Sequence, residues 1–278
     1  MYLVDLHIHS EKSSDGALSY EEIFKQAKGL GISVLSITDH GELNDYDSIT
    51  CFLNDFQNMR YVAGIEITGW LDGYRYHILG YGIDRSYKGA VDDILLASKK
   101  SLADFANKVL KLLQNDGYQI DFDEYEKFKF KPGGKGSFKL QQYLIAKNIC
   151  FDHKSYSDIY GKIKPSLNWE KKPDIKDIII AIKNSGGVSV LAHPGSYEIN
   201  DFTKAIRPML DFGINGIECF HPNNNPKCTE DCIDIATKNN LLITGGSDFH
   251  GENVNSYRMG SPRIDISQLR IDGIPFLV

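Results

Sequence analysis

Seven of the eight histidines of this chain lie at the ends of short apolar runs, beside acidic or turn-forming residues. The segments that hold them, together with the acidic residues of the same pattern, are Val4–His9, Ser14–Gly16, Ile37–His40, Gly64–Glu66, Tyr76–His77, Leu191–Gly195, Phe220–Pro222 and Ser247–His250. Only His153 lies outside such a segment, and it is interpreted as a surface residue. Side chains at strand ends converge on metal ions, so the pattern favours a fold that brings many strand ends together.

The apolar runs are rich in β-branched and aromatic residues and predict seven strands. These are Leu3–Leu6, Ser33–Ile37, Tyr61–Ile67, Tyr74–Leu79, Gly187–Leu191, Gly216–Cys219 and Leu241–Thr244. Helices are predicted between several of them, at Ser19–Leu30 with a Ser19–Glu22 capping box, Lys176–Asn184, Thr203–Phe212 and Lys227–Lys238. This alternation predicts a parallel α/β barrel, which builds its site at the C-terminal ends of its strands.

The alternation is lost between about residues 92 and 173, where helices are predicted at Ile94–Asn115 and Phe138–Lys147. We therefore predict three segments: residues 1–91 as the first part of the barrel, 92–173 as an inserted helical subdomain, and 174–278 as the second part. The insertion falls between two histidine segments, so we expect it to project over the barrel mouth and to influence substrate choice.

Composition excludes several classes of protein. The five cysteines form no C-x-x-C pair, which argues against a disulfide framework or a zinc ribbon, and Cys228 and Cys232 are interpreted as packing residues on one helix face. The chain opens without a basic region, and no window approaches the roughly 18 apolar residues of a membrane span. A cytoplasmic protein without a membrane partner is expected. The net charge of −6 argues against binding duplex DNA.

Individual positions predict a multinuclear metal site. His7 and His9 are two apart on a strand, so both rings lie on one face, about 6.6 Å apart. His40 ends an apolar strand, where the neighbouring Asp39 is placed to fix its tautomer. The Glu66 carboxylate is placed to bridge two ions, although a buried salt bridge to Arg75 is the alternative. Several divalent ions would make this region a strong anion site inside an acidic protein.

Two segments after the second-half strands carry further chemistry. Asp248 and His250 follow Gly245 and Gly246, which we interpret as space for ions rather than as a phosphate loop. His221 precedes Asn223–Asn225, whose amides suit an anionic oxygen better than a transition metal. We therefore expect His221 to contact the substrate and to assist proton transfer to the leaving group.

A cationic and aromatic segment in the insertion is a second candidate for substrate contact. Lys127–Lys131 alternates lysine with phenylalanine, and Lys135 and Lys139 follow. Such a segment is suited to hold a phosphate or to stack a base. An exposed strand edge, protected by its charges, explains the alternation equally well.

Together, the patterns H-x-H, D-G, T-D-H, G-I-E, A-H-P-G, E-x-x-H-P and G-G-S-D-x-H-G resemble the PHP (polymerase and histidinol phosphatase) superfamily, and most of all its stand-alone metal-dependent phosphoesterases. The resemblance implies a distorted (β/α)7 barrel and two or three divalent ions of manganese, iron or zinc. It implies one set of ligands formed by His7, His9, Glu66 and Asp248, a second formed by Asp15, His40 and His250, and a third formed by Glu66, His77 and His193.

The function expected from this resemblance is hydrolysis of phosphomonoesters or phosphodiesters of nucleotides or short single-stranded oligoribonucleotides, for example a nucleoside 3′,5′-bisphosphate. Attack by a metal-bound hydroxide requires no side-chain nucleophile. The alternatives are a histidinol phosphate phosphatase, a metal-dependent hydrolase of carbon–nitrogen or carbon–oxygen bonds, and a non-enzymatic metal-stabilised module. Assays with phosphomonoesters and with lactones or amides separate a phosphoesterase from the carbon–nitrogen or carbon–oxygen hydrolase.

Overall fold

The computed structural model describes most of the chain. The described residues are 2–13, 15–43, 49, 53–56, 58–84, 86, 89–131, 135–136, 138–197, 202–252, 254 and 256–276. Ser14, Cys51 and residues 132–134, which belong to patterns noted above, lie outside these ranges.

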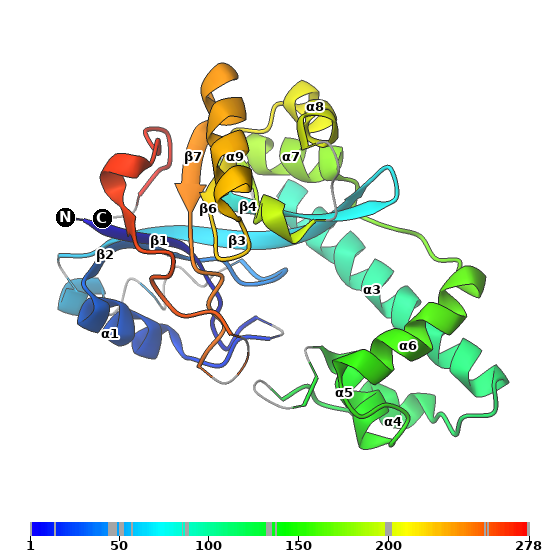
Figure 1. Cartoon of the computed structure of the whole chain (residues 1–278). Helices are drawn as coiled ribbons and strands as arrows, with labels where there is room; N and C mark the ends of the chain where they lie inside the picture. Colours follow the sequence, from blue (N-terminus) through cyan, green and yellow to red (C-terminus); the bar gives the residue numbers. More distant parts are fainter. Residues whose placement is uncertain are drawn as a thin grey trace.

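The strands form one sheet in the order β7-β6-β5-β4-β3-β2-β1-β8 (Figure 1). Their bounds are β1 (Leu3–Ile8), β2 (Ile32–Ile37), β3 (Arg60–Leu71), β4 (Tyr74–Tyr81), β5 (Val188–Leu191), β6 (Gly216–Phe220), β7 (Leu242–Gly245) and β8 (Ile264–Asp265). The segment after β7 closes on β1, because the Asp248 amide donates to the His7 carbonyl and the His9 amide donates to the Phe249 carbonyl, each over 2.8 Å. The strands β1–β7 therefore make a nearly closed barrel.

All seven predicted strands are present, so the α/β barrel is confirmed. The short strand β8, which pairs antiparallel with β1, was not predicted, because two residues carry no readable periodicity.

The expectation of a wholly parallel barrel is wrong at β4. This strand runs antiparallel to both β3 and β5. Asp72 and Gly73 join β3 to β4 with φ values of 51° and 84°, the left-handed pair of a tight hairpin. A parallel neighbour would need a crossover of a dozen or more residues, and two residues leave no room for one.

The helices are α1 (Tyr20–Leu30), α3 (Gly89–Asn115), α4 (Phe122–Lys127), α5 (Lys139–Ala146), α6 (His153–Ile163), α7 (Ile175–Asn184), α8 (Phe202–Phe212) and α9 (Pro226–Lys238), with 3₁₀ turns η1 (Asn54–Phe56), η3 (Lys164–Ser166), η4 (Pro194–Ser196) and η5 (Ile266–Gln268). The predicted capping box of α1 is present. No helix in the described ranges is long and apolar enough to cross a membrane.

Three apolar layers position the barrel. Residues of α1 pack on the outer faces of β1–β3, and residues of α3, α7, α8 and α9 pack on those of β3–β7. A third cluster fills the interior with Val4 and Leu6 of β1, Val34, Val62 and other strand residues. Because this cluster fills the rest of the barrel interior, polar groups have room at only one end of it.

The strand β1 breaks its alternation where the functional residues begin. Leu6 faces the interior cluster and Ile8 faces the outer layer, yet His7 also points into the barrel, where its ring meets Glu218. The pairing of β1 with β2 shifts register between Asp5 and Ile8. An irregularity of this kind re-aims side chains beside a site.

The helices α3–α6 separate β4 from β5, and α4, α5 and α6 lie to one side of the barrel (Figure 1). They share an apolar cluster of their own, formed by the C-terminal half of α3 with α4, α5 and α6. The first turns of α3 instead pack on the barrel through Val91 and Leu95. The division of the chain at residues 92 and 173 remains our proposal.

Candidate metal centre

Nine side chains predicted as metal ligands lie together at the open end of the barrel. They come from the end of β1, the loops after β1, β2, β5 and β7, and the strands β3 and β4: His7, His9, Asp15, His40, Glu66, His77, His193, Asp248 and His250. Glu66 is at the centre, buried to 1 % exposure and within ion-pair distance of five histidine rings. The structure therefore surrounds Glu66 with imidazoles and not with Arg75.

The first group has nearly equal spacings. The five distances recorded among His7 Nε2, His9 Nε2, Glu66 Oε2 and Asp248 Oδ1 are all 3.2 or 3.3 Å. The sixth pair, Glu66 Oε2 and Asp248 Oδ1, lies within 4.8 Å. A point equidistant from four atoms so spaced lies about 2.0 to 2.4 Å from each, close to the length of a bond from zinc to nitrogen or oxygen. This donor set therefore fits one divalent ion.

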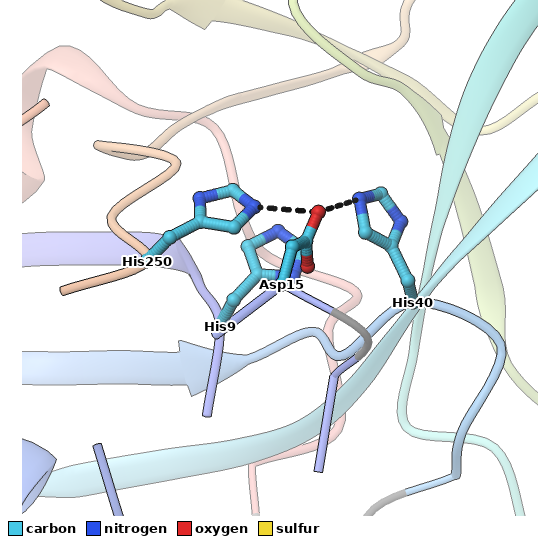
Figure 2. Close-up of side chains that lie close together, drawn as sticks. All are labelled: His9, Asp15, His40 and His250. Carbon is cyan, nitrogen blue, oxygen red and sulfur yellow. Dashed lines mark ion pairs between the residues drawn. The ribbon is translucent and has the colours of Figure 1, made fainter. Parts of the chain in front are cut away.

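The second group is centred on Asp15, whose Oδ2 lies 3.4 Å from Nε2 of His40 and 3.4 Å from Nε2 of His250. Figure 2 shows the carboxylate between these two rings, with His9 beside it. The His9 and His250 rings stack with centroids 4.0 Å apart. The ligand atoms of all four residues lie within 4.8 Å of one another.

The third group uses the other oxygen of Glu66. Its Oε1 lies 2.7 Å from His77 Nδ1 and 2.9 Å from His193 Nε2, and these two nitrogens are 3.2 Å apart. Glu66 thus presents Oε2 to the first group and Oε1 to the third. This is the arrangement of a carboxylate that bridges two ions.

Glu218, which sequence reasoning did not single out, orients two members of the cluster. Its Oε1 lies 3.0 Å from Nδ1 of His7, and its Oε2 accepts from the His193 amide over 2.6 Å. A carboxylate on the second ring nitrogen fixes the tautomer of a metal-binding histidine. The E-x-x-H-P pattern contained this residue, but its neighbours in sequence gave no indication that it faces His7.

Asp5 fixes the loop after β7 to β1. Its buried carboxylate accepts from the amides of Ser247 and Gly260, each over 2.8 Å. The loop brings Asp248 to the cluster with φ of 54°, and His193 arrives with φ of 30°. Non-glycine residues held in this left-handed region cluster at functional sites.

Asp39 does not face the His40 ring, so the predicted fixing of its tautomer by Asp39 is wrong. The Asp39 carboxylate accepts from the backbone amide and the hydroxyl of Ser10, over 2.6 and 2.7 Å. The hydroxyl of Ser13 instead lies at the centre of the second group, where it donates to Asp15 over 2.7 Å and accepts from the His40 amide over 3.1 Å.

The carboxylates of the cluster are held ionised. Burial raises the pKa of Glu66, but the charges of His40, His77 and His7 outweigh it and hold this pKa well below the usual range. Asp248 behaves in the same way: burial is outweighed chiefly by the charge of His7, and its pKa lies well below the usual range.

Two histidines of the first group hold protons at neutral pH. Burial alone would lower the pKa of His9, but hydrogen bonds and charges from Asp248 and Glu66 raise it to about 10. Burial is likewise outweighed at His7, where the charges of Glu218, Asp248 and Glu66 raise the pKa well above its ordinary value. These protons place positive charge where the donor geometry fits a cation.

His221 lies at the edge of the first group and is buried to 2 % exposure. Its Nδ1 accepts from the Asn223 amide over 3.0 Å, which leaves the ring proton on Nε2. Nε2 lies 3.4 Å from Oδ2 of Asp248, longer than a good hydrogen bond. Nε2 has no hydrogen-bond partner among the described residues, so in this tautomer its N–H is available to a ligand.

The side-chain amides of Asn223 and Asn224 donate within the fold, so their interpretation as anion-binding groups is wrong, while that of Asn225 stays a prediction. Asn223 donates to Ser196 Oγ and Tyr257 OH. Asn224 donates to two backbone carbonyls of β6, and Asn225 caps α9. These contacts shape the loop that holds His221.

The glycines before Asp248 do not make space for ions. A Cβ on Gly246 would collide with the Cβ and backbone nitrogen of His7, and one on Gly245 would meet Phe220 at 2.6 Å. The space beside them is filled by protein, because this is the seam where β1 and β7 close the barrel.

The cationic segment of the insertion is not a strand. Lys127 ends α4, and residues 128–131 have no strand partner, so the strand-edge alternative is wrong. Lys139 Nζ lies over the Tyr125 ring, 4.7 Å from its centroid, and donates to the Glu126 carbonyl. Lys135 is exposed. The substrate contacts of Lys135 and Lys139 remain predictions.

A cavity of about 900 Å³ opens above the cluster. Its lining includes Asp15, His40, Glu66, His77, His193, Asp248 and His250, and also Arg75, Lys164, Tyr197 and Tyr257, which sequence reasoning did not select. Lys164 follows α6 and lies in the insertion, so the insertion supplies part of the cavity wall, as expected for a segment near the barrel mouth.

The chain is similar in sequence to known proteins over most of its length. The sequence profile of the PHP domain matches residues 5–185. The phosphoribosyl 1,2-cyclic phosphate 1,2-diphosphodiesterase of Eggerthella lenta is 28% identical over 258 residues, which cover 89% of this chain and 94% of the relative. The 3′,5′-nucleoside bisphosphate phosphatase of Chromobacterium violaceum is 26% identical over 254 residues, covering 89% and 87%.

The fold has a close counterpart among solved structures. A presumed metal-dependent phosphoesterase of Bifidobacterium adolescentis superposes with a TM-score of 0.73 at 24% identity, covering 93% of this chain and 91% of that one. The barrel and the segments around it are therefore shared over nearly the whole chain.

Proposed function

The chain belongs to the PHP domain family, and we propose that it is a metal-dependent phosphoesterase of nucleotides or short oligoribonucleotides. The observation that carries the proposal is the nearly regular set of donor atoms from His7, His9, Glu66 and Asp248. Imidazole nitrogens and carboxylate oxygens so arranged bind divalent transition ions, and polar groups of this density are otherwise costly to bury.

We assign two or three ions of manganese, iron or zinc to the three groups described above. His7, His9, Glu66 and Asp248 would hold the first, Asp15, His40 and His250 the second, and Glu66, His77 and His193 the third. When bound, such ions activate water and neutralise the charge that develops on a phosphoryl group.

His221 is placed to act on the substrate through Nε2. Because Nδ1 accepts the Asn223 amide, the ring is neutral and its Nε2–H is a hydrogen-bond donor. Loss of that proton would leave an imidazolate, so transfer of a proton from His221 would first require a second proton on the ring. We therefore favour a hydrogen bond from His221 to a phosphate oxygen over a role as general acid.

The substrate class follows from the relatives and from the cavity. Both relatives named above act on phosphorylated sugars or nucleotides, as their names state. A cavity of about 900 Å³ has the size of a site for a small phosphorylated molecule. A nucleoside 3′,5′-bisphosphate or the 5′ end of a short RNA is the substrate that we propose.

The proposal is tested by metal content and phosphate release measured on one preparation. We expect two or three equivalents of manganese, iron or zinc per chain, and faster phosphate release from adenosine 3′,5′-bisphosphate or 5′-phosphorylated RNA than from histidinol phosphate. A protein that binds no divalent ion, or that hydrolyses a lactone or amide but no phosphoester, would contradict it.

Metal affinity is expected to rise with pH. In the metal-free protein His7 and His9 are protonated at neutral pH, with the pKa of His9 at about 10, and a metal ion binds only the deprotonated rings. Each displaced proton makes binding about tenfold tighter per pH unit below that pKa. Competition with a chromogenic chelator at about pH 6 and about pH 8 measures the slope, and an affinity independent of pH would show that these rings hold no proton.

A further inference from the structure

Two cations line the same cavity as the metal cluster but belong to other parts of the chain. Arg75 lies near the start of β4, and Lys164 begins η3 directly after α6. The cavity therefore joins a floor of imidazoles and carboxylates to a wall that carries positive charge.

The position of Arg75 follows from the alternation of β4. Arg75 and His77 are two apart on one strand, so their side chains leave the same face, about 7 Å apart along the backbone. His77 contacts Glu66. Arg75 therefore lies one step further out along the wall that begins at the cluster.

Neither cation is neutralised by a carboxylate among the described residues. Lys99, Lys147 and other surface lysines have acidic partners within 2.7 Å. Arg75 and Lys164 make no such pair within the described ranges. The groups that feel the charge of Arg75 are tyrosines, including Tyr197 and Tyr160, whose pKa values are raised chiefly by burial while Arg75 lowers them.

The segment after Lys164 is fixed to the hairpin that carries Arg75. The Trp169 ring meets Trp70 edge to face at 5.1 Å, the Lys171 ammonium donates to the Gly73 carbonyl over 3.2 Å, and the Trp70 amide donates to the Pro173 carbonyl over 3.0 Å. Contacts of this kind fix the two segments that carry Arg75 and Lys164 relative to each other before a ligand binds, which lowers the entropic cost of binding.

We propose that Arg75 and Lys164 bind a second phosphate group of the substrate, while the phosphoester to be cleaved lies at the metal cluster. The guanidinium matches a phosphate with two parallel hydrogen bonds, and the ammonium adds a second positive charge. The enzyme would then select sugars or nucleosides that carry two phosphates over those that carry one. This inference rests on the proposed phosphoesterase function.

Matched substrates test the proposal in the metal-loaded enzyme. We expect Arg75→Gln and Lys164→Gln each to lower kcat/KM for adenosine 3′,5′-bisphosphate by about 10- to 100-fold, about 1.4 to 2.8 kcal/mol at 1.4 kcal/mol per tenfold. Activity on the adenosine 3′- and 5′-monophosphates should change by less than about twofold, because these substrates lack one phosphate. Lys162→Gln, at an exposed site two residues before Lys164, is the control and should behave as the wild type.

An equal loss on monophosphates and bisphosphate would overturn the proposal, as would a wild-type enzyme that does not prefer the bisphosphate. Binding of adenosine 3′,5′-bisphosphate to chelator-treated protein, measured by calorimetry, separates this proposal from the proposed function. Binding that is lost in Arg75→Gln without any hydrolysis by the loaded wild type would support the second-phosphate site and overturn the phosphoesterase function. Binding unchanged in both variants would overturn the second-phosphate site.

Discussion

Replacing Glu66 with glutamine is expected to reduce phosphate release by about 10³-fold or more and to lower the metal content of the purified protein. The carboxylate oxygens of Glu66 contact His7, His9 and His40 on one side and His77 and His193 on the other. Glutamine keeps the shape but removes the negative charge and replaces one oxygen by an amide nitrogen, which cannot bind a cation. Of the two ligand groups that share Glu66, one therefore loses a ligand atom and the other keeps only a neutral oxygen.

The matched control is Glu22→Gln, which makes the same chemical change at an exposed site. Glu22 closes the capping box of α1 by accepting from the Ser19 amide over 2.8 Å, and glutamine keeps an acceptor there. We expect this variant to retain its metal and its activity. Metal analysis and steady-state phosphate release on both variants test whether Glu66 holds the metal. A Glu66→Gln enzyme with full metal content and undiminished turnover would exclude Glu66 from the site.

Much of the candidate site was predictable, because most of its residues lie at or after the ends of strands, and parallel strand ends meet at one face of a barrel. Glu66 and His77 instead lie within β3 and β4. The nine proposed ligands were selected from their places beside short apolar runs, and the structure brings all nine together, His193 through its contacts with Glu66 and His77. The strands themselves were readable because their β-branched composition is bounded by turn-forming residues.

Other features depend on contacts that no local pattern encodes. Strict alternation from Leu6 would turn His7 away from the barrel interior, and only the register shift within β1 brings it inside. Glu218 orients His7 from 211 positions away in the chain. The antiparallel β4, in contrast, could have been predicted, because Asp72-Gly73 between two strands is a strong hairpin signal.

Gly245 and Gly246 carried a correct sequence signal, but the physical reason predicted for it was wrong. Their clustering before Asp248 indicated that side chains are excluded there, but sequence could not say what excludes them. The structure places the backbone of His7 against Gly246, whose own amide donates to the Phe220 carbonyl over 3.0 Å. The excluded volume therefore belongs to the barrel seam and not to the proposed ion sites.

The variant Gly246→Ala is accordingly expected to damage both stability and activity. The new Cβ would collide with the backbone of β1, which cannot rotate away as a side chain can, so β1 and the loop after β7 must separate. Overpacking of this kind costs about 2–3 kcal/mol, which lowers Tm by about 3–5 °C in a chain of this size. Displacing Asp248 from His7, now 3.3 Å away, should lower turnover by about 10²-fold.

Gly161→Ala makes the same chemical change in α6, but we expect it to raise the stability of the protein instead of lowering it. A Cβ at Gly161 meets nothing within 4 Å, and alanine in a helix interior is favoured over glycine by about 0.5–1 kcal/mol. Thermal melting of the chelator-treated proteins separates the effect of the seam from that of lost metal. If Gly246→Ala had the same Tm as the wild type and kept its metal, the close packing of β1 against this loop would not be what holds His7 and Asp248 together.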